Sequence, residues 1–148
     1  MTHWFEDMPP GFRFGGGPVE IGRDDITGFA GDWDPQPFHL DEAAARETHF
    51  GGLVASGWHT LLIGFRLSIG AGIWNAASMG ASGMDEVRFL RPVFPGDLLR
   101  LEAEVVSAEP SRSRPDRGRL RIRHDILNQH GERVASFIGN HLMKRRPD

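Results

Sequence analysis

Residues 56–72 read SGWHTLLIGFRLSIGAG, and this stretch decides the fold of the chain. Between residues 61 and 69, only a glycine, an arginine and a serine interrupt the run of large apolar side chains. A helix with so little polar surface is expected to be buried nearly all round. Ser56 is a good N-cap, so we expect the helix to run from Ser56 to about Ala71. Its glycines indicate that another backbone packs closely against it.

The segments after this helix change to a period of two. Leu120, Ile122, His124 and Ile126 alternate with arginines and an aspartate. Such alternation is typical of an antiparallel sheet with one covered face. A proline-rich, polar segment at 109–118 predicts a hairpin loop, and the Pro-Gly-Asp at 95–97 predicts a tight turn. Four strands are expected, at residues 84–90, 99–105, 120–126 and 134–143.

The segments before the helix are shorter. Residues 19–21 predict a short strand, residues 24–30 a short helix, and residues 41–48 a second short helix that Asp41 caps. One apolar helix followed by four long antiparallel strands is arranged most economically as a sheet curled around that helix. We therefore expect an α+β chain with the hot-dog fold, as a single domain over residues 1–148.

Composition restricts the function classes. The chain has 148 residues and no cysteine, which excludes disulfides, thiolate nucleophiles and cysteine metal sites. Residues 1–87 carry four Lys/Arg and twelve Asp/Glu, and residues 88–148 carry thirteen Lys/Arg and eight Asp/Glu. The net charges of the two halves are therefore −8 and +5. The basic half could hold a phosphorylated ligand, or it could be a set of solvated strand faces. We expect no nucleic-acid partner, no signal peptide and no membrane span, hence a cytoplasmic protein.

The segment Phe29–Thr60 carries the chemistry. Asp34 and His39 lie five residues apart, with prolines at 35 and 37 between them. Two prolines disfavour a helix and predict a stiff, extended loop. A carboxylate and an imidazole held by such a loop could together bind one water molecule and move its proton near neutral pH.

This segment resembles the MaoC-like dehydratase and R-specific enoyl-CoA hydratase family, which carries an Asp, then Asn-Pro, then His. The resemblance places Asp34 on the catalytic aspartate, Gln36 on the asparagine, Pro37 on the proline and His39 on the catalytic histidine. It extends to an apolar pair and a His-Gly at the start of the hot-dog helix. Gly57 matches that glycine, and the sequence departs from the pattern at Ser56, where hydratases of the family often have histidine.

The resemblance implies an enzyme of fatty acid metabolism, a hydro-lyase that adds water reversibly to the 2,3 double bond of an enoyl-CoA. Asp34 and His39 would handle the water, and the Gly57 N–H would hold the thioester oxygen. It implies no metal and no cofactor beyond the coenzyme A of the substrate, and a homodimer or a dimer of dimers. Arg91 could meet coenzyme A phosphates, and His59 could face the acyl pocket. The predicted substrate contacts are Gln36, Pro37, Ser56, Trp58, His59 and Arg91.

Two other functions remain open from the sequence. A hot-dog thioesterase could use the same carboxylate and water to attack the thioester carbon instead of the double bond. A non-catalytic acyl-CoA-binding subunit could pair with an active one, although the intact Asp34 and His39 argue against it. Release of free thiol would indicate hydrolysis, whereas loss of enoyl absorbance without thiol would indicate hydration.

Overall fold

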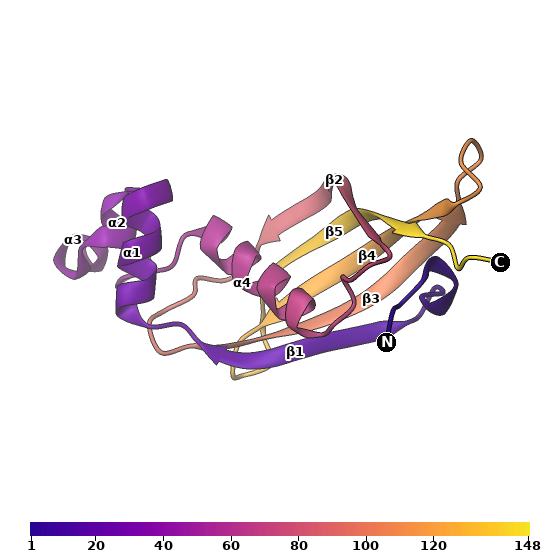
Figure 1. Ribbon diagram of the computed structural model, residues 1–148. Helices are drawn as coiled ribbons and strands as arrows, with labels where there is room; N and C mark the ends of the chain where they lie inside the picture. Colours follow the sequence, from indigo (N-terminus) through magenta and orange to yellow (C-terminus); the bar gives the residue numbers. More distant parts are fainter.

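The computed structural model describes residues 1–148 as one antiparallel sheet curled around one long helix (Figure 1). The strands follow the order β1-β3-β4-β5-β2 across the sheet. Helix α4 packs against β1, β3, β4 and β5, which is the hot-dog arrangement. None of the helices has the length and hydrophobicity that a membrane span requires. The elements are η1 Phe5–Asp7, β1 Arg13–Glu20, α1 Arg23–Trp33, α2 Pro37–Leu40, α3 Glu42–Arg46, α4 Gly57–Gly70, β2 Ser78–Phe89, β3 Leu98–Pro110, β4 Arg117–Leu127 and β5 Arg133–Lys144.

The core lies between the concave face of the sheet and α4. On β4, Leu120, Ile122, His124 and Ile126 are all fully buried, while the residues between them face outward. On β3, the alternate residues from Leu99 to Val105 are buried in the same way. The period-two pattern therefore predicted the covered face of these strands correctly.

The prediction that α4 is buried nearly all round is wrong. One face is buried, but four large apolar residues on the other are 42–65 % exposed. The glycines at 64, 70 and 72 differ in packing: a Cβ on Gly64 would lie 2.6 Å from Ile126 Cγ1, whereas Gly70 and Gly72 have no such neighbour. The chain by itself thus leaves an apolar stripe uncovered. The exposed residues are Trp58, Leu62, Phe65 and Ile69.

The sheet has a fifth strand where the sequence predicted a three-residue segment. Strand β1 covers Arg13–Glu20 and pairs with β3 at the sheet edge, with a register shift between Gly16 and Val19. Its centre is Gly15-Gly16-Gly17, which has no side chains to show an alternating pattern. A Cβ on Gly16 would lie 3.2 Å from the Leu67 carbonyl oxygen, so glycine lets the strand approach α4.

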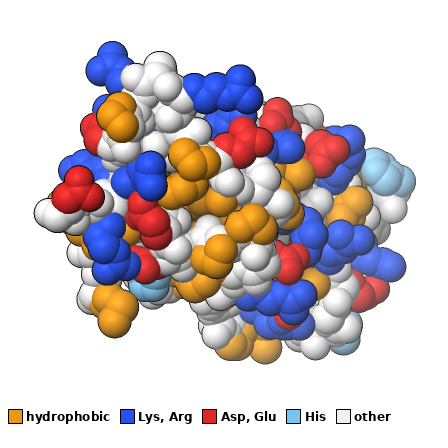
Figure 2. All heavy atoms as spheres, turned by 90° about the vertical axis from the view of Figure 1, so that its right-hand side faces the viewer, with side chains coloured by type: hydrophobic (Ala, Val, Ile, Leu, Met, Phe, Trp, Pro, Cys, Tyr) orange, Lys and Arg blue, Asp and Glu red, His pale blue; other side chains and the backbone are white.

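The basic half of the chain forms no patch of one sign. Figure 2 shows the end of the molecule that carries both termini and the β3–β4 hairpin, where blue and red side chains lie side by side. Ion pairs account for this mixture, since acidic residues of β3 and η1 reach several of the arginines. The structure favours the interpretation as solvated strand faces. The pairs at this end are Arg117–Asp116, Arg119–Glu109, Arg145–Glu6 and Arg146–Asp7.

Candidate active site

Asp34 and His39 come from the ends of two short helices that lie beside the N-terminus of α4 (Figure 1). Asp34 is the C-cap of α1, and its N–H donates to the Ala30 carbonyl at 2.9 Å. His39 lies within α2, so the predicted extended loop through this residue is wrong. Pro37 occupies the first turn of α2, where its missing N–H costs no helical hydrogen bond.

The imidazole of His39 is fixed from both sides. Nδ1 lies 2.6 Å from the Val54 carbonyl oxygen, and Nε2 lies 3.3 Å from Asp34 Oδ2. A carbonyl can only accept, so Nδ1 carries a proton and donates it. In the neutral ring Nε2 therefore holds the lone pair, directed toward the carboxylate. The two side chains are only 7 % and 17 % exposed, so little bulk water competes for the space around them.

Two neutral donors hold the carboxylate of Asp34. Gln36 Nε2 donates to Oδ1 at 2.6 Å, and Ser56 Oγ donates to Oδ2 at 2.7 Å. These bonds, the Gln36 bond first, lower the pKa of Asp34 below its usual value, and the effect of burial opposes them. Asp34 is therefore ionised at neutral pH.

Ser56 does not act as the predicted side-chain cap. It occupies the N-cap position of α4, but its hydroxyl donates to Asp34 and no side-chain bond caps the helix. The N–H groups of Gly57, Trp58 and His59 consequently have no acceptor within the chain. Free N–H groups and the helix dipole make this helix start a site for a negatively charged oxygen.

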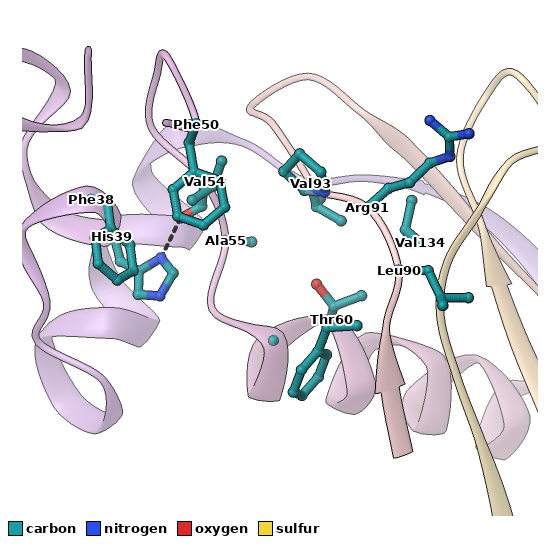
Figure 3. A pocket seen from close by; sticks show the side chains of 13 residues that line it. Phe38, His39, Phe50, Val54, Ala55, Thr60, Leu90, Arg91, Val93 and Val134 are labelled. Atoms are coloured by element: carbon teal, nitrogen blue, oxygen red, sulfur yellow. Dashed lines mark hydrogen bonds between the residues drawn. The ribbon is translucent and has the colours of Figure 1, made fainter. Parts of the chain in front are cut away.

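A cavity of about 350 Å³ opens beside these groups (Figure 3). His39 lies at one end of it, Leu90 and Arg91 lie at the other, and Thr60 lies between them. Asp34 and Ser56 are not on its wall, so His39 is the member of the pair that faces the cavity. The wall is formed by Phe38, His39, Phe50, Val54, Ala55, Gly57, Thr60, Phe89, Leu90, Arg91, Pro92, Val93 and Val134.

Comparison with known proteins identifies the family. The model of the family described as "MaoC like domain" matches residues 9–124. This chain belongs to the MaoC-like domain family. A MaoC-like dehydratase from Rhodospirillum rubrum superposes with a TM-score of 0.91 at 43 % identity over 99 % of both chains. The R-hydratase PhaJ1 from Pseudomonas aeruginosa gives a TM-score of 0.77 at 26 % identity, over 97 % of this chain and 86 % of that one. The uncharacterized protein YdeM of Bacillus subtilis is 35 % identical over 86 % of this chain and 89 % of its own.

Of the predicted substrate contacts, some line the cavity of this MaoC-like domain and others do not. Arg91 reaches the cavity wall, and its Nη1 pairs with Glu132 Oε2 at 3.0 Å. Gln36 and Pro37 position Asp34 and His39 but lie off the wall. His59 does not face this cavity, because its ring stacks on Phe29 of α1 at 4.5 Å.

Sequence reasoning placed only His39, Gly57 and Arg91 at the cavity wall, and Thr60 and Phe89 are among the wall residues that it missed. Thr60 is buried, and its hydroxyl donates only a long bond of 3.4 Å to the Ser56 carbonyl oxygen. Phe89 lies against the start of α4, where a Cβ on Gly57 would come within 2.5 Å of its ring. A threonine within an apolar helix could have signalled Thr60, whereas no sequence pattern places Phe89 against Gly57.

Proposed function

We propose that the chain is a hydro-lyase that adds water reversibly to the 2,3 double bond of an enoyl-CoA, forming the R-3-hydroxyacyl-CoA. The observation that carries the proposal is the His39 imidazole, whose Nδ1 donates to Val54 and whose Nε2 lies 3.3 Å from the Asp34 carboxylate at the wall of a cavity. His39 Nε2 can accept a proton from a water in the cavity, and the Asp34 carboxylate beside it can stabilise the charge that the ring then carries. Membership of the MaoC-like family and the likeness to an R-hydratase support the assignment.

In this reaction the water oxygen bonds to C3 while one of its protons passes to the Asp34–His39 pair. The π electrons of the double bond move toward the thioester, which gives an enolate-like intermediate. C2 then takes a proton from the pair, and His39 is the donor because it faces the cavity. The lowered pKa of Asp34 makes its carboxylate the poorer final acceptor, so a proton that it takes can pass to His39 Nε2. The pair ends in the protonation state in which it began.

The negative charge on the thioester oxygen needs a donor that is already in place. Gly57 lines the same cavity as His39, and its N–H has no acceptor within the chain. We assign this N–H as the donor to the thioester oxygen. The hydrogen bond between them strengthens as negative charge develops on that oxygen. Thr60, one turn further along α4, offers its hydroxyl as a second donor on the same wall.

A second copy of the chain would cover the apolar stripe on α4. Strand β2 is an edge strand next to this stripe, and most of its residues are exposed. An unpaired edge beside 42–65 % exposed Trp58, Leu62, Phe65 and Ile69 is a surface that a soluble enzyme normally covers. We therefore assign a homodimer, with coenzyme A entering past Arg91 at the other end of the site.

The decisive experiment follows enoyl absorbance and thiol release together on a series of 2-enoyl-CoA substrates. Hydration removes enoyl absorbance and releases no thiol, whereas thioester hydrolysis releases thiol. Asp34→Asn keeps the shape of the side chain and removes its charge, His39→Gln removes the imidazole, and each should lower kcat by a factor of about 10²–10⁴. Glu47→Gln, an exposed acidic residue in the same half of the chain, is the control and should leave kcat unchanged. Thiol release, or near-normal turnover in both active-site variants, would contradict the proposal.

A further inference from the structure

Arg91 is the only Lys, Arg, Asp or Glu among the residues that line the active-site cavity. It lies at the end opposite His39, and Figure 3 shows its side chain extending away from that histidine. The side chain is 57 % exposed, so it meets the solvent at the mouth of the cavity. A guanidinium in this place can attract an anionic part of a ligand whose reacting part enters the cavity.

The turn between β4 and β5, residues 128–132, holds this guanidinium from outside the cavity. Arg91 Nη1 lies 3.0 Å from Glu132 Oε2, and Asn128 Nδ2 donates to Glu132 Oε1 at 3.1 Å. Asn128 is only 7 % exposed, and its Oδ1 accepts the N–H groups of His130 and Glu132 at 2.9 and 3.1 Å. Its amide cannot rotate without breaking these three hydrogen bonds. The carboxylate that meets Arg91 is therefore itself held in place.

The same turn is joined to the chain on both sides of Arg91. Gln129 Nε2 donates to Asp97 Oδ1 at 2.9 Å, in the turn that follows the cavity wall. Before this turn, the backbone N–H groups of Leu90 and Arg91 donate to the Val134 carbonyl oxygen at 2.8 and 3.2 Å. The backbone of Arg91 and the acid that meets its guanidinium thus belong to one hydrogen-bonded unit.

The Arg91–Glu132 pair is better suited to orientation than to stability. At 57 % and 37 % exposure, such a pair contributes little to the free energy of unfolding. An arginine side chain is long and flexible, however, and a ligand that binds it must otherwise order it. The contact with Glu132 uses Nη1, which leaves most of the five N–H donors for a ligand. The planar fork of a guanidinium matches a phosphate with two parallel hydrogen bonds.

We propose that Glu132 is a positioning residue that holds the Arg91 guanidinium ready for a phosphate group on the carrier arm of the substrate. Asn128 acts one step further out, because it holds Glu132. The proposal rests on the proposed function, which supplies a thioester whose carrier enters past Arg91. It names the substrate class as thioesters of a phosphorylated carrier, in preference to thioesters of uncharged thiols. The phosphate can belong to the phosphopantetheine arm or to the nucleotide part of coenzyme A.

The negative charge of Glu132 has an effect of the opposite sign, because it repels a phosphate. Exposed charges are screened by water and by salt, over about 8 Å at physiological ionic strength. Ordering a long side chain, by contrast, costs a factor of about two to ten in affinity. The gain from orientation should therefore exceed the repulsion, and removing the carboxylate should weaken binding. The sign of the change separates the two effects.

The first test compares kcat and KM for one 2-enoyl group on coenzyme A, on phosphopantetheine and on N-acetylcysteamine, which has no phosphate. Glu132→Ala should raise KM about two- to tenfold for a phosphorylated carrier, with kcat unchanged and no effect on the cysteamine thioester. Arg91→Ala should raise that KM further, and adding Glu132→Ala to it should change nothing more. Glu42→Ala is the matched control: Glu42 is 42 % exposed, pairs with Arg23 at 3.3 Å, and neither residue lines the cavity.

The three carriers also locate the phosphate. An effect shared by phosphopantetheine and coenzyme A supports the proposal with the phosphate of the arm, and an effect confined to coenzyme A supports it with a nucleotide phosphate. A lowered KM in Glu132→Ala, an equal change for all three carriers, or an added effect in the Arg91→Ala background would overturn the proposal.

The second test does not depend on turnover. Free coenzyme A and pantetheine are titrated into the native chain while the Nε–H resonance of Arg91 is followed. Coenzyme A should shift this resonance and pantetheine should not, and Glu132→Ala should weaken coenzyme A binding by the same factor as it raises KM. An Arg91 resonance that responds to neither ligand would overturn the proposal. Selective binding of coenzyme A by a chain that hydrates no enoyl-CoA would instead refute the hydratase assignment and retain the phosphate site.

Discussion

At the scale of single residues, the hydrogen bonds to Asp34 are the feature that sets its charge. Removing a donor should raise the pKa of this carboxyl toward its ordinary value, because Gln36 and Ser56 are the two largest contributions that lower it. Ser56→Ala and Gln36→Ala should therefore shift the acid limb of the kcat/KM profile to higher pH, and Gln36→Ala should shift it further. Ser68→Ala removes another buried hydroxyl of the same helix, one that does not contact Asp34, and should leave the profile unchanged. An acid limb that stays in place in both variants would show that Asp34 does not control it.

A second prediction at this scale concerns Gly57 and Phe89. An alanine at Gly57 keeps the N–H, but its Cβ would lie 2.5–2.8 Å from the Phe89 ring. Gly57→Ala should therefore lower kcat/KM through displacement of the ring and not through loss of the donor. In a chain that already carries Phe89→Ala, adding Gly57→Ala should lower kcat/KM much less than it does in the native chain. A double variant as impaired as Gly57→Ala would indicate that the methyl group obstructs the thioester oxygen directly.

The sequence predicted the Asp34–His39 pair correctly as neighbours but not what holds them. The two side chains lie 3.3 Å apart as expected, although His39 is in the short helix α2 and not in the extended loop that the prolines predicted. The bonds to Ser56 and to the Val54 carbonyl join residues that lie 22 and 15 positions apart, so they depend on how α2 docks beside α4. Local pattern carries no information on such docking, and Ser56 consequently looked like an ordinary cap.

At the scale of elements, local sequence also could not predict that one face of α4 is exposed. Its apolar run predicted a buried helix, and composition alone cannot show whether the burying surface is the chain's own sheet or another molecule. Only the end of β1 was predicted, as the short strand at residues 19–21, because the three glycines in the middle of β1 carry no side-chain pattern. Of the strands with strict alternation, β4 was predicted to within three residues at each end, whereas β3 was predicted to within one residue at its start and continues to Pro110, past the predicted end at residue 105.

The exposed stripe of α4 gives a prediction for assembly. Ile69 is 46 % exposed and does not line the active-site cavity, so Ile69→Glu places a charge on the stripe without changing the site. If a second copy covers this stripe, the variant should shift the sedimentation equilibrium toward the monomer, because a buried, unpaired carboxylate is costly. Arg66→Glu, an exposed change on the same helix, is the control for a general charge effect. A native chain that sediments as a monomer at all concentrations would contradict the assigned dimer.

At the scale of the whole molecule, buried histidines should dominate the acid side of the stability curve. Burial, with a contribution from neighbouring His141, lowers the pKa of His124 to about 3, and burial lowers that of His141 to about 4. Below about pH 6.5 these two histidines are therefore protonated in the unfolded chain but not in the folded chain. The free energy of unfolding consequently falls as the pH drops toward the folded-state pKa values. The carboxyl groups with lowered pKa values, such as Asp34, act in the same direction, but only as the pH approaches their ordinary pKa values near 4.

The window between about pH 6 and pH 5 therefore isolates the histidines. Each contributes at most about 1.4 kcal/mol of lost stability per pH unit there, the slope of one proton. His124→Phe removes one such proton and places another aromatic ring against Phe137, on which His124 stacks at 4.4 Å. Urea titrations over this window should give a free energy of unfolding that changes with pH less steeply in the variant, by about one proton. Above pH 7 the two slopes should differ less, because neither chain binds a proton at this position there. Parallel curves across the whole range would mean that His124 is protonated in the folded chain, against its burial between the sheet and α4.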